Sequence, residues 1–202
     1  MAARAAFEQQ HRYPAVGLLA LAITLTVYVL NQIEICRPSA LYVGLVLVTG
    51  GGIQLFSGVR SHQQGRSYAA ATMLPLGIFW LSLISYDIFP ELGLGRHPNS
   101  ITMFSYLSLW GMFMALLFLG SFRQNIAIQT LYGSMMFSFF ALAMDHIRDD
   151  QVFLVLGCSM GGFASVVAAY MAFAQIYNDR AGREKLPLGA VLPEDDDENF
   201  DS

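Results

Sequence analysis

The sequence predicts an all-α membrane protein with six transmembrane helices in each protomer. Hydrophobic residues make up 55% of the 202 residues and charged residues only 13%, with a mean hydropathy of +0.48. This balance is typical of a membrane domain rather than of a soluble globular one. The hydrophobic residues gather in six stretches, each close to the ~20 residues that a helix needs to cross a bilayer. The stretches are Ala15 to Asn31, Leu41 to Val59, Tyr68 to Phe89, Ile101 to Phe122, Ile126 to Met144 and Val152 to Tyr177.

The first stretch follows Arg4 and Arg12, and basic residues before an apolar run are also typical of a secretory signal peptide. This run is long for the apolar part of a signal peptide. The segment Asn31–Glu34 that follows it lacks small residues at the spacing of a cleavage site. A retained first helix is therefore predicted.

The second and third stretches contain residues that weaken helices. Gly50-Gly51-Gly52 lies inside the second stretch, where three consecutive glycines lower helix stability. They either admit a neighbouring backbone or leave irregular backbone, which survives in lipid only when it is buried or lines a wet cavity. Pro75 lies inside the third stretch, two residues before Gly77, and removes one backbone hydrogen bond. Close packing is favoured for the glycines, and a kink is expected at the proline.

The last three stretches are long and apolar, and the sixth is rich in small residues. It contains Gly157 and Gly161 at GxxxG spacing, continued by Gly162 and Ala164, a pattern through which membrane helices approach closely. Charged residues surround His146 between the fifth and sixth stretches, which favours a solvated loop over a pH-sensing role.

The arginines and lysines between the stretches predict the orientation, because short cytoplasmic loops carry an excess of them. With the N-terminus inside, eight lie on the cytoplasmic side and three on the opposite side. Both termini are therefore expected in the cytoplasm. The first group is Arg4, Arg12, Arg60, Arg66, Arg123, Arg180, Arg183 and Lys185, and the second is Arg37, Arg96 and Arg148.

The chain divides into a cytoplasmic segment at 1–13, a transmembrane domain at 14–178 and a cytoplasmic acidic tail at 179–202. The acidic run Glu194–Glu198 supplies most of the net charge of −4. The remaining chain is close to neutral, so nucleic acid is not expected as a partner. Lipid surrounds the domain, and the plasma membrane is the expected location.

Ionisable side chains are missing from the middle of all six stretches. The groups that usually mark a proton relay or a fixed ion site in a membrane are therefore absent from the sequence pattern. The stretches also offer no ligand set for a metal or cofactor and no nucleophile, so an enzyme is not predicted. Gln54 is the most unusual polar residue, because an amide is costly in hydrocarbon and it follows the glycine run directly. Neutral walls of this kind suit a small solute held by hydroxyls, amides and backbone N–H groups.

Four strings in order along the chain together resemble the acetate uptake transporter family. This family includes the YaaH-type succinate–acetate permeases and their fungal acetate and ammonia-export relatives. Each string is weak alone, but together they cover nearly the whole chain. They are Gly50–Gly58, Gly77–Ser82, Tyr106–Phe113, and Tyr177–Arg183 followed by Leu186–Gly189.

The resemblance implies a hexamer in which each six-helix protomer holds its own solute path. It also implies a hydrophobic constriction near mid-membrane, where relatives carry Phe, Tyr and Leu and this chain has Leu21, Leu76 and Met136. A position that influences substrate size in relatives falls at Ala168. The family's Asn-Pro-Ala-Pro string is altered here, to Tyr13–Gly17. The expected constriction is therefore aliphatic and differs in shape from that of the family.

The resemblance implies a channel or transporter for acetate and similar short carboxylates, succinate included. The expected path uses Thr24, Gly50–Gly52 and Gln54 as its polar approach, with Ala168 nearby. One alternative is a channel for ammonia, ammonium or another small neutral solute. Another is a membrane scaffold that transports nothing.

Overall fold

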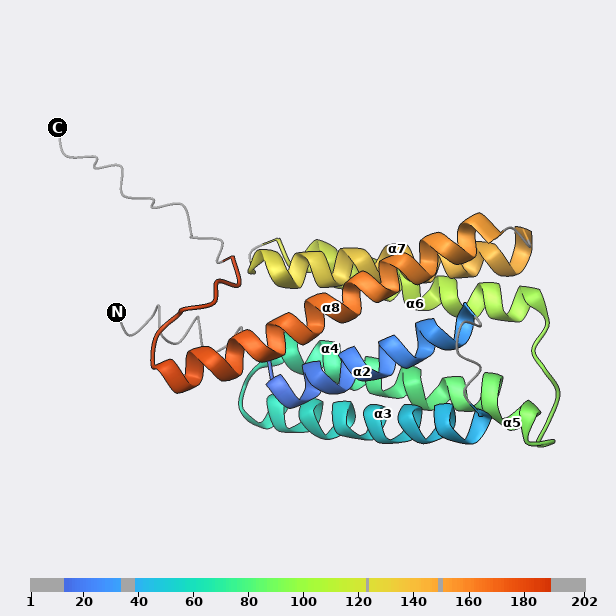
Figure 1. Cartoon of the computed structure of the whole chain (residues 1–202), viewed down its shortest axis with the longest axis horizontal. Coiled ribbons are helices and arrows are strands. Elements are labelled where there is room, and N and C mark those ends of the chain that lie inside the picture. Colours follow the sequence, from blue (N-terminus) through green and yellow to red (C-terminus); the bar gives the residue numbers. More distant parts are fainter. Residues whose placement is uncertain (1–12, 34–38, 123, 149–150, 190–202) are drawn as a thin grey trace.

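The computed structural model describes residues 13–33, 39–122, 124–148 and 151–189. Within these ranges, six helical spans are long and apolar enough to cross a membrane (Figure 1). The predicted all-α fold class with six spans is therefore confirmed. The elements are α2 (Ala15–Gln32), α3 (Ala40–Gln63), α4 (Ser67–Leu83), η1 (Ile84–Ile88), α5 (Phe89–Glu91), α6 (Ser100–Gly120), α7 (Ile126–Arg148) and α8 (Gln151–Ala181).

One expectation about the helix ends was wrong, and several others concern residues that the structure does not describe. Because α7 continues to Arg148, His146 lies in its last turn, and the prediction of a loop at this position was wrong. Residues 1–12 of the predicted N-terminal segment, the acidic run Glu194–Glu198, Arg37 and Arg123 all lie outside the described residues.

Local sequence explains where several helices begin and how α4 ends. The side chains of Ser39 and Asn99 cap α3 and α6, each accepting a hydrogen bond from a backbone N–H three residues later. The helix α4 runs through Pro75 and continues into the π-helical turn η1. The kink expected at the proline stays a prediction.

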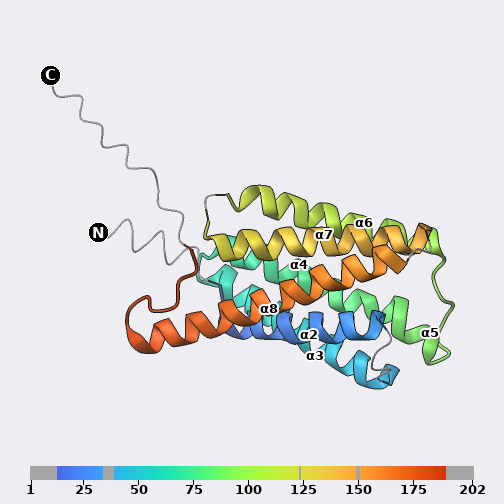
Figure 2. The same cartoon turned by 45° about the horizontal axis from the view of Figure 1, so that its top comes forward.

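The six spans form a closed ring in which neighbours along the chain are also neighbours in space. Helix α2 packs on α3, α3 on α4, α6 on α7 and α7 on α8, and α8 returns to α2. The ring closes between α4 and α6 through Phe79 and Tyr106, whose ring centroids lie 5.9 Å apart. Two contacts cross the interior from α4 to α7: the hydroxyl of Thr72 bonds that of Tyr132, and Phe79 packs on Phe139. Figures 1 and 2 show this bundle from two directions.

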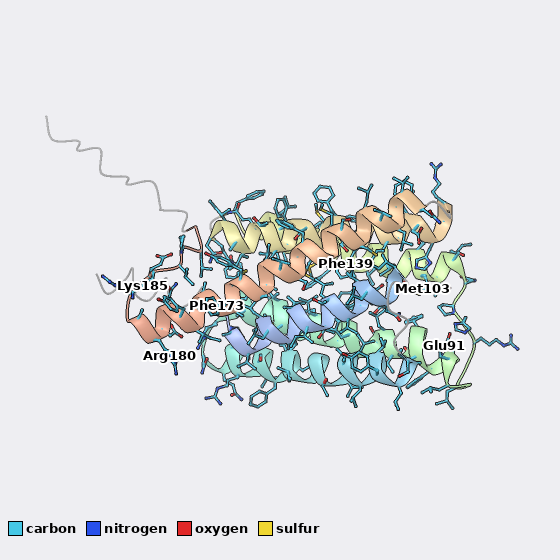
Figure 3. All side chains as sticks on the ribbon, in the orientation of Figure 1. Glu91, Met103, Phe139, Phe173, Arg180 and Lys185 are labelled. Carbon is cyan, nitrogen blue, oxygen red and sulfur yellow. The ribbon has the colours of Figure 1, made fainter. Side chains whose placement is uncertain are left out.

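The outer surface of the bundle is apolar along its length and charged at its ends. Leu116 of α6 is 69% exposed and Val166 of α8 is 67% exposed. Figure 3 shows Arg180 and Lys185 at one end and Glu91 at the other. Exposed apolar faces of this extent match a hydrocarbon surrounding rather than water. The start of α2 and the end of α8 lie at the same end of the bundle, as the predicted topology requires (Figure 1).

Candidate functional site

The glycine run of α3 brings three helices together near the middle of the ring. Its backbone is helical throughout, so close packing is the interpretation that the structure supports. A Cβ atom on Gly50 would lie 2.0 Å from Oγ1 of Thr24, and one on Gly51 would lie 3.0 Å from the carbonyl oxygen of Gly77. Gly52 is exposed, with no atom within 4 Å of such a Cβ. Gly52 therefore faces away from the interior, and we leave it out of the path proposed below.

Thr24 is fully buried against the glycine run on α3. Its hydroxyl donates to the backbone carbonyl of Ala20 at 2.5 Å, within its own helix. This bond uses the hydroxyl hydrogen, so the two lone pairs of the Thr24 oxygen can still accept hydrogen bonds.

Gln54 is the least satisfied polar group in the interior. It is fully buried, and neither Nε2 nor Oε1 has a hydrogen-bond partner within the described ranges. It lies one turn beyond Gly50, and the turn Gly51–Leu55 faces Gly77 of α4. A buried group without a partner costs about 1–3 kcal/mol, so a whole amide left this way calls for an explanation. A polar solute in the interior would supply the missing partners.

The predicted constriction residues lie inside the ring or at its edge. Leu21 and Leu76 are completely buried. On α4, Leu76 lies between Thr72, which bonds Tyr132, and Phe79, which packs on Phe139. Leu76 therefore lies beside the part of α7 that contains Met135 and Met136. Met136 is partly buried, whereas Met135, which sequence analysis did not identify, is 1% exposed. Ala168 of α8 is completely buried. Assignment of these side chains to a constriction stays a prediction.

A polar network lies on one side of this level, at the end where α2 begins. The hydroxyls of Tyr13 and Tyr132 are 2.6 Å apart, and the Tyr13 hydroxyl donates to Oε1 of Gln124 at 3.4 Å. Tyr132 also bonds the hydroxyl of Thr72, which donates to the backbone carbonyl of Tyr68. Burial raises the pKa of Tyr13 above its ordinary value, so this hydroxyl keeps its proton at neutral pH.

Sequence analysis missed this network because its members are distant in the chain. Tyr13 precedes the first helix, and Gln124 lies in the short connection before α7. Neither position falls inside a predicted span. The altered string at Tyr13–Gly17 was the only signal in the sequence that pointed to this region.

The opposite side of the same level is aromatic. The ring of Phe79 lies 4.7 Å from that of Trp80 and 4.9 Å from that of Phe139, measured between centroids. Nε1 of Trp80 is buried and has no hydrogen-bond partner in the described part of the chain. Edge-to-face contacts of this kind give a rigid cluster. Its members are Tyr28, Phe79, Trp80, Tyr106, Trp110 and Phe139.

The last of the four sequence strings has a structural role at the end of α8. Oδ1 of Asn178 accepts the backbone N–H groups of Lys185 and Leu186, both at 2.9 Å. The backbone N–H of Ile126 donates to the carbonyl of Gly189 at 2.8 Å. These bonds hold the segment after α8 against the first turn of α7, close to the polar network.

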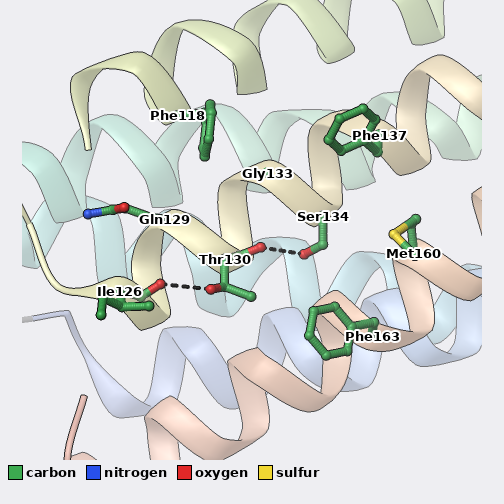
Figure 4. Close-up of a pocket in the computed structure, with 9 residues that line it drawn as sticks. All are labelled: Phe118, Ile126, Gln129, Thr130, Gly133, Ser134, Phe137, Met160 and Phe163. Atoms are coloured by element: carbon green, nitrogen blue, oxygen red, sulfur yellow. Dashed lines mark hydrogen bonds between the residues drawn. The ribbon is translucent and has the colours of Figure 1, made fainter. Parts of the chain in front are cut away.

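A groove on the outside of the bundle is separate from the interior. It has a volume of about 510 Å³ and runs between α6, α7 and α8 (Figure 4). Gln129 and Thr130 line one end, and Phe137 and Phe163, which are 61% and 49% exposed, line the outer side. Its walls face away from the ring, so it is not part of a path through the protomer.

The chemistry available in the interior is uncharged. Every buried polar side chain among the described residues belongs to Ser, Thr or Gln, apart from the tyrosine and tryptophan groups described above. In this part of the chain no three His, Cys, Asp or Glu side chains are grouped to hold a metal ion. The interior therefore offers neutral donors and acceptors between hydrophobic layers.

Six helices that are long and apolar enough to span a membrane define the class of protein as a multi-pass integral membrane protein. The model of the GPR1/FUN34/yaaH family matches residues 8–187, and the chain belongs to that family.

The relatives named SatP are a symporter and a channel. The chain is 26% identical over 173 residues to the succinate-acetate/proton symporter SatP of Escherichia coli K12, covering 86% of this chain and 92% of that protein. It is 27% identical over 185 residues to the glyoxylate pathway regulator of Yarrowia lipolytica, covering 88% of this chain and 65% of that protein. The solved structure of the bacterial acetate channel SatP superposes with a TM-score of 0.81 at 26% identity, covering 87% of this chain and 97% of that one.

Proposed function

We propose that this protein conducts acetate and similar short carboxylates across the membrane, through the interior of each protomer. The single observation that carries the proposal is Gln54, a fully buried amide whose Nε2 and Oε1 both lack a hydrogen-bond partner among the described residues. Related proteins that match over most of the chain are named as a succinate-acetate/proton symporter and as an acetate channel. A carboxylate or carboxylic acid would satisfy the amide of Gln54, and the methyl group of acetate suits the apolar surroundings.

The path that we propose passes Thr24, Gly50, Gly51 and Gln54 and then crosses the level of Leu21, Leu76 and the methionine pair of α7. Ala168 leaves room on the α8 side of that level. Aliphatic side chains do not replace the water that a carboxylate loses on passing between them. The constriction therefore favours the protonated acid or a lightly hydrated small anion over larger charged solutes.

The remaining features of the proposal concern assembly and location. Both termini lie in the cytoplasm, the protein resides in the plasma membrane, and the transmembrane domain spans residues 14–178. The positive-inside distribution of Arg and Lys supports the orientation. A hexamer follows from the family resemblance, and the exposed apolar faces of α6 and α8 offer surface for contacts between protomers.

Uptake of labelled acetate in cells that lack their own acetate uptake tests the proposal. We expect uptake well above that of an empty vector, rising as external pH falls toward the pKa of acetic acid. The variant Gln54→Leu keeps the side-chain size but removes the amide, and we expect uptake to fall by at least tenfold. Thr49→Val is the matched control, because Thr49 lies on the exposed face of the same helix. Wild-type uptake equal to that of the empty vector would reject the proposal.

The same cells distinguish the alternatives. Flux of ammonium without flux of acetate would favour a channel for ammonia or ammonium. No flux of acetate, succinate or ammonium would favour a scaffold.

A further inference from the structure

We propose that Tyr13, Tyr132 and Gln124 form a binding site for the carboxylate group of the solute, at the end of the path where α2 begins. This inference rests on the proposed function and adds a second site to it, one that precedes the constriction. Tyr13 comes from the residue pair before α2, more than 100 positions from Gln124 in the connection before α7 and Tyr132 in the second turn of α7. Only the closed ring brings them together.

Burial shows that the site is built into the interior. Tyr13 is 2% exposed, Tyr132 is 1% exposed and Gln124 is 4% exposed. Nε2 of Gln124 nevertheless has no hydrogen-bond partner among the residues that the structure describes. A buried amide nitrogen without an acceptor is as costly here as at Gln54. The site therefore holds an unused donor beside two hydroxyls.

The hydrogens in the network show that it is incomplete. Tyr13, Tyr132 and Thr72 carry one hydroxyl hydrogen each, three in total. The contacts number four: Tyr13 with Gln124, Tyr13 with Tyr132, Tyr132 with Thr72, and Thr72 with the carbonyl of Tyr68. The other two atoms in the network, Oε1 of Gln124 and the carbonyl oxygen of Tyr68, only accept hydrogen bonds. Three hydroxyl hydrogens cannot form four hydrogen bonds, so one contact lacks a hydrogen.

Turning over the amide of Gln124 does not complete the network. Oxygen and nitrogen of an amide are assigned from hydrogen bonds rather than observed. With Nε2 toward Tyr13, one N–H would serve the fourth contact. The second N–H would still lack an acceptor, and Oε1 would lose its donor. At least one amide N–H is therefore unpaired in either orientation.

A carboxylate group resolves this shortage, because it only accepts hydrogen bonds and has about four sites at which to do so. The hydroxyls of Tyr13 and Tyr132 and an N–H of Gln124 would each donate to it, in place of the Tyr13–Tyr132 and Tyr132–Thr72 contacts, while Thr72 continues to donate to Tyr68. Hydrogen bonds to an ionised acceptor are roughly twice as strong as neutral ones. A carboxylate would thus replace the short contact between the two tyrosine hydroxyls. An ammonium ion, which only donates, would leave the amide N–H groups unused.

Apparent KM for acetate, measured in proteoliposomes with the protein in one orientation, tests the site. In Tyr13→Phe the ring remains and one donor is lost, and we expect apparent KM to rise several-fold. In Gln124→Glu the donors are replaced by a carboxylate, and we expect a rise of at least tenfold. Both rises should be larger when acetate enters from the side where α2 begins, a dependence that a purely structural role would not produce. Ammonium flux, if present, should not fall in Gln124→Glu.

Asn125→Asp is the matched control, since it makes the same amide-to-carboxylate change at the adjacent residue. Oδ1 of Asn125 accepts the backbone N–H of Ile128 at 2.9 Å, and a carboxylate oxygen does the same. We expect apparent KM to stay within twofold of wild type. The near-ultraviolet absorbance of tyrosine on acetate addition to purified protein gives a second measurement, independent of flux, and the change should shrink in Tyr13→Phe.

The outcomes separate this site from the proposed function. Wild-type flux with unchanged apparent KM in both Tyr13→Phe and Gln124→Glu overturns the site and leaves the function intact. Equal rises in Gln124→Glu and Asn125→Asp also overturn it, since the cause would then be a general charge effect. No carboxylate flux in the wild type rejects the function, and the site with it.

Discussion

The two ends of the interior differ in chemistry although the same helices build both. At the end where α2 begins, α4 and α7 meet through the hydroxyls of Thr72 and Tyr132. Two turns further along both helices, they meet through Phe79 and Phe139. One end therefore contains a network of hydroxyl and amide groups, whereas the other is a tightly packed aromatic cluster.

This difference suggests a division between binding and support. At the polar end, the amide nitrogen of Gln124, which has no acceptor among the described residues, lies beside the hydroxyls of Tyr13 and Tyr132. Such a group of donors is costly unless a ligand uses it, so it indicates function more than stability. Interlocked aromatic rings lose contacts when any one is removed, so the aromatic end stabilises the ring of helices. The proposed constriction lies between the two ends.

Removing an aromatic ring from the supporting end should have the largest effect on stability. We expect Phe139→Ala to lower the free energy of unfolding by about 3 kcal/mol or more, because the ring is 1% exposed and leaves a cavity. Phe137→Ala is the matched control on the same helix, where the ring is 61% exposed. Thermal unfolding of the purified protein measures both. Equal losses in the two variants would contradict the supporting role of this end.

The glycine contacts between the two ends should have an intermediate effect. In Gly77→Ala the new methyl group would lie 2.8 Å from the carbonyl oxygen of Gly51, a backbone atom that cannot move aside. We expect a loss of about 1–3 kcal/mol, typical of overpacking. In Gly52→Ala the methyl group meets no atom within 4 Å, and alanine favours the helix over glycine by up to about 1 kcal/mol. The thermal midpoint should fall in the first variant and stay constant or rise in the second.

Removing one hydroxyl from the aromatic end should have the smallest effect. Tyr106→Phe loses the hydrogen bond to Ser82, whose hydroxyl also donates to the carbonyl of Phe79. We expect a loss of about 1 kcal/mol and no change in the apparent KM for acetate. A rise in apparent KM as large as that of Tyr13→Phe would show that both ends bind the solute, and the division proposed above would be wrong.

Sequence reasoning located the helices well because each span must satisfy its own backbone and present an apolar surface to lipid. Hydropathy and length therefore predicted the six spans, and Gln54 was identified because it is an amide within an apolar stretch. Position along the chain could not separate Gly52 from Gly50 and Gly51, which differ only in the face of α3 on which they lie. The same limit applies to Met135 and Met136 of α7, because a shift of one residue moves a side chain by about 100° around a helix.

The sequence by itself therefore determined the class of the protein, the number of its spans and the neutral character of its interior, since these depend on local composition. Tertiary structure alone decided which residues meet. Tyr13, Thr72, Gln124 and Tyr132 are separated by up to 119 positions yet share one hydrogen-bond network. That network exists only because α2, α4 and α7 converge when the ring closes, and no local pattern encodes a contact between residues so far apart.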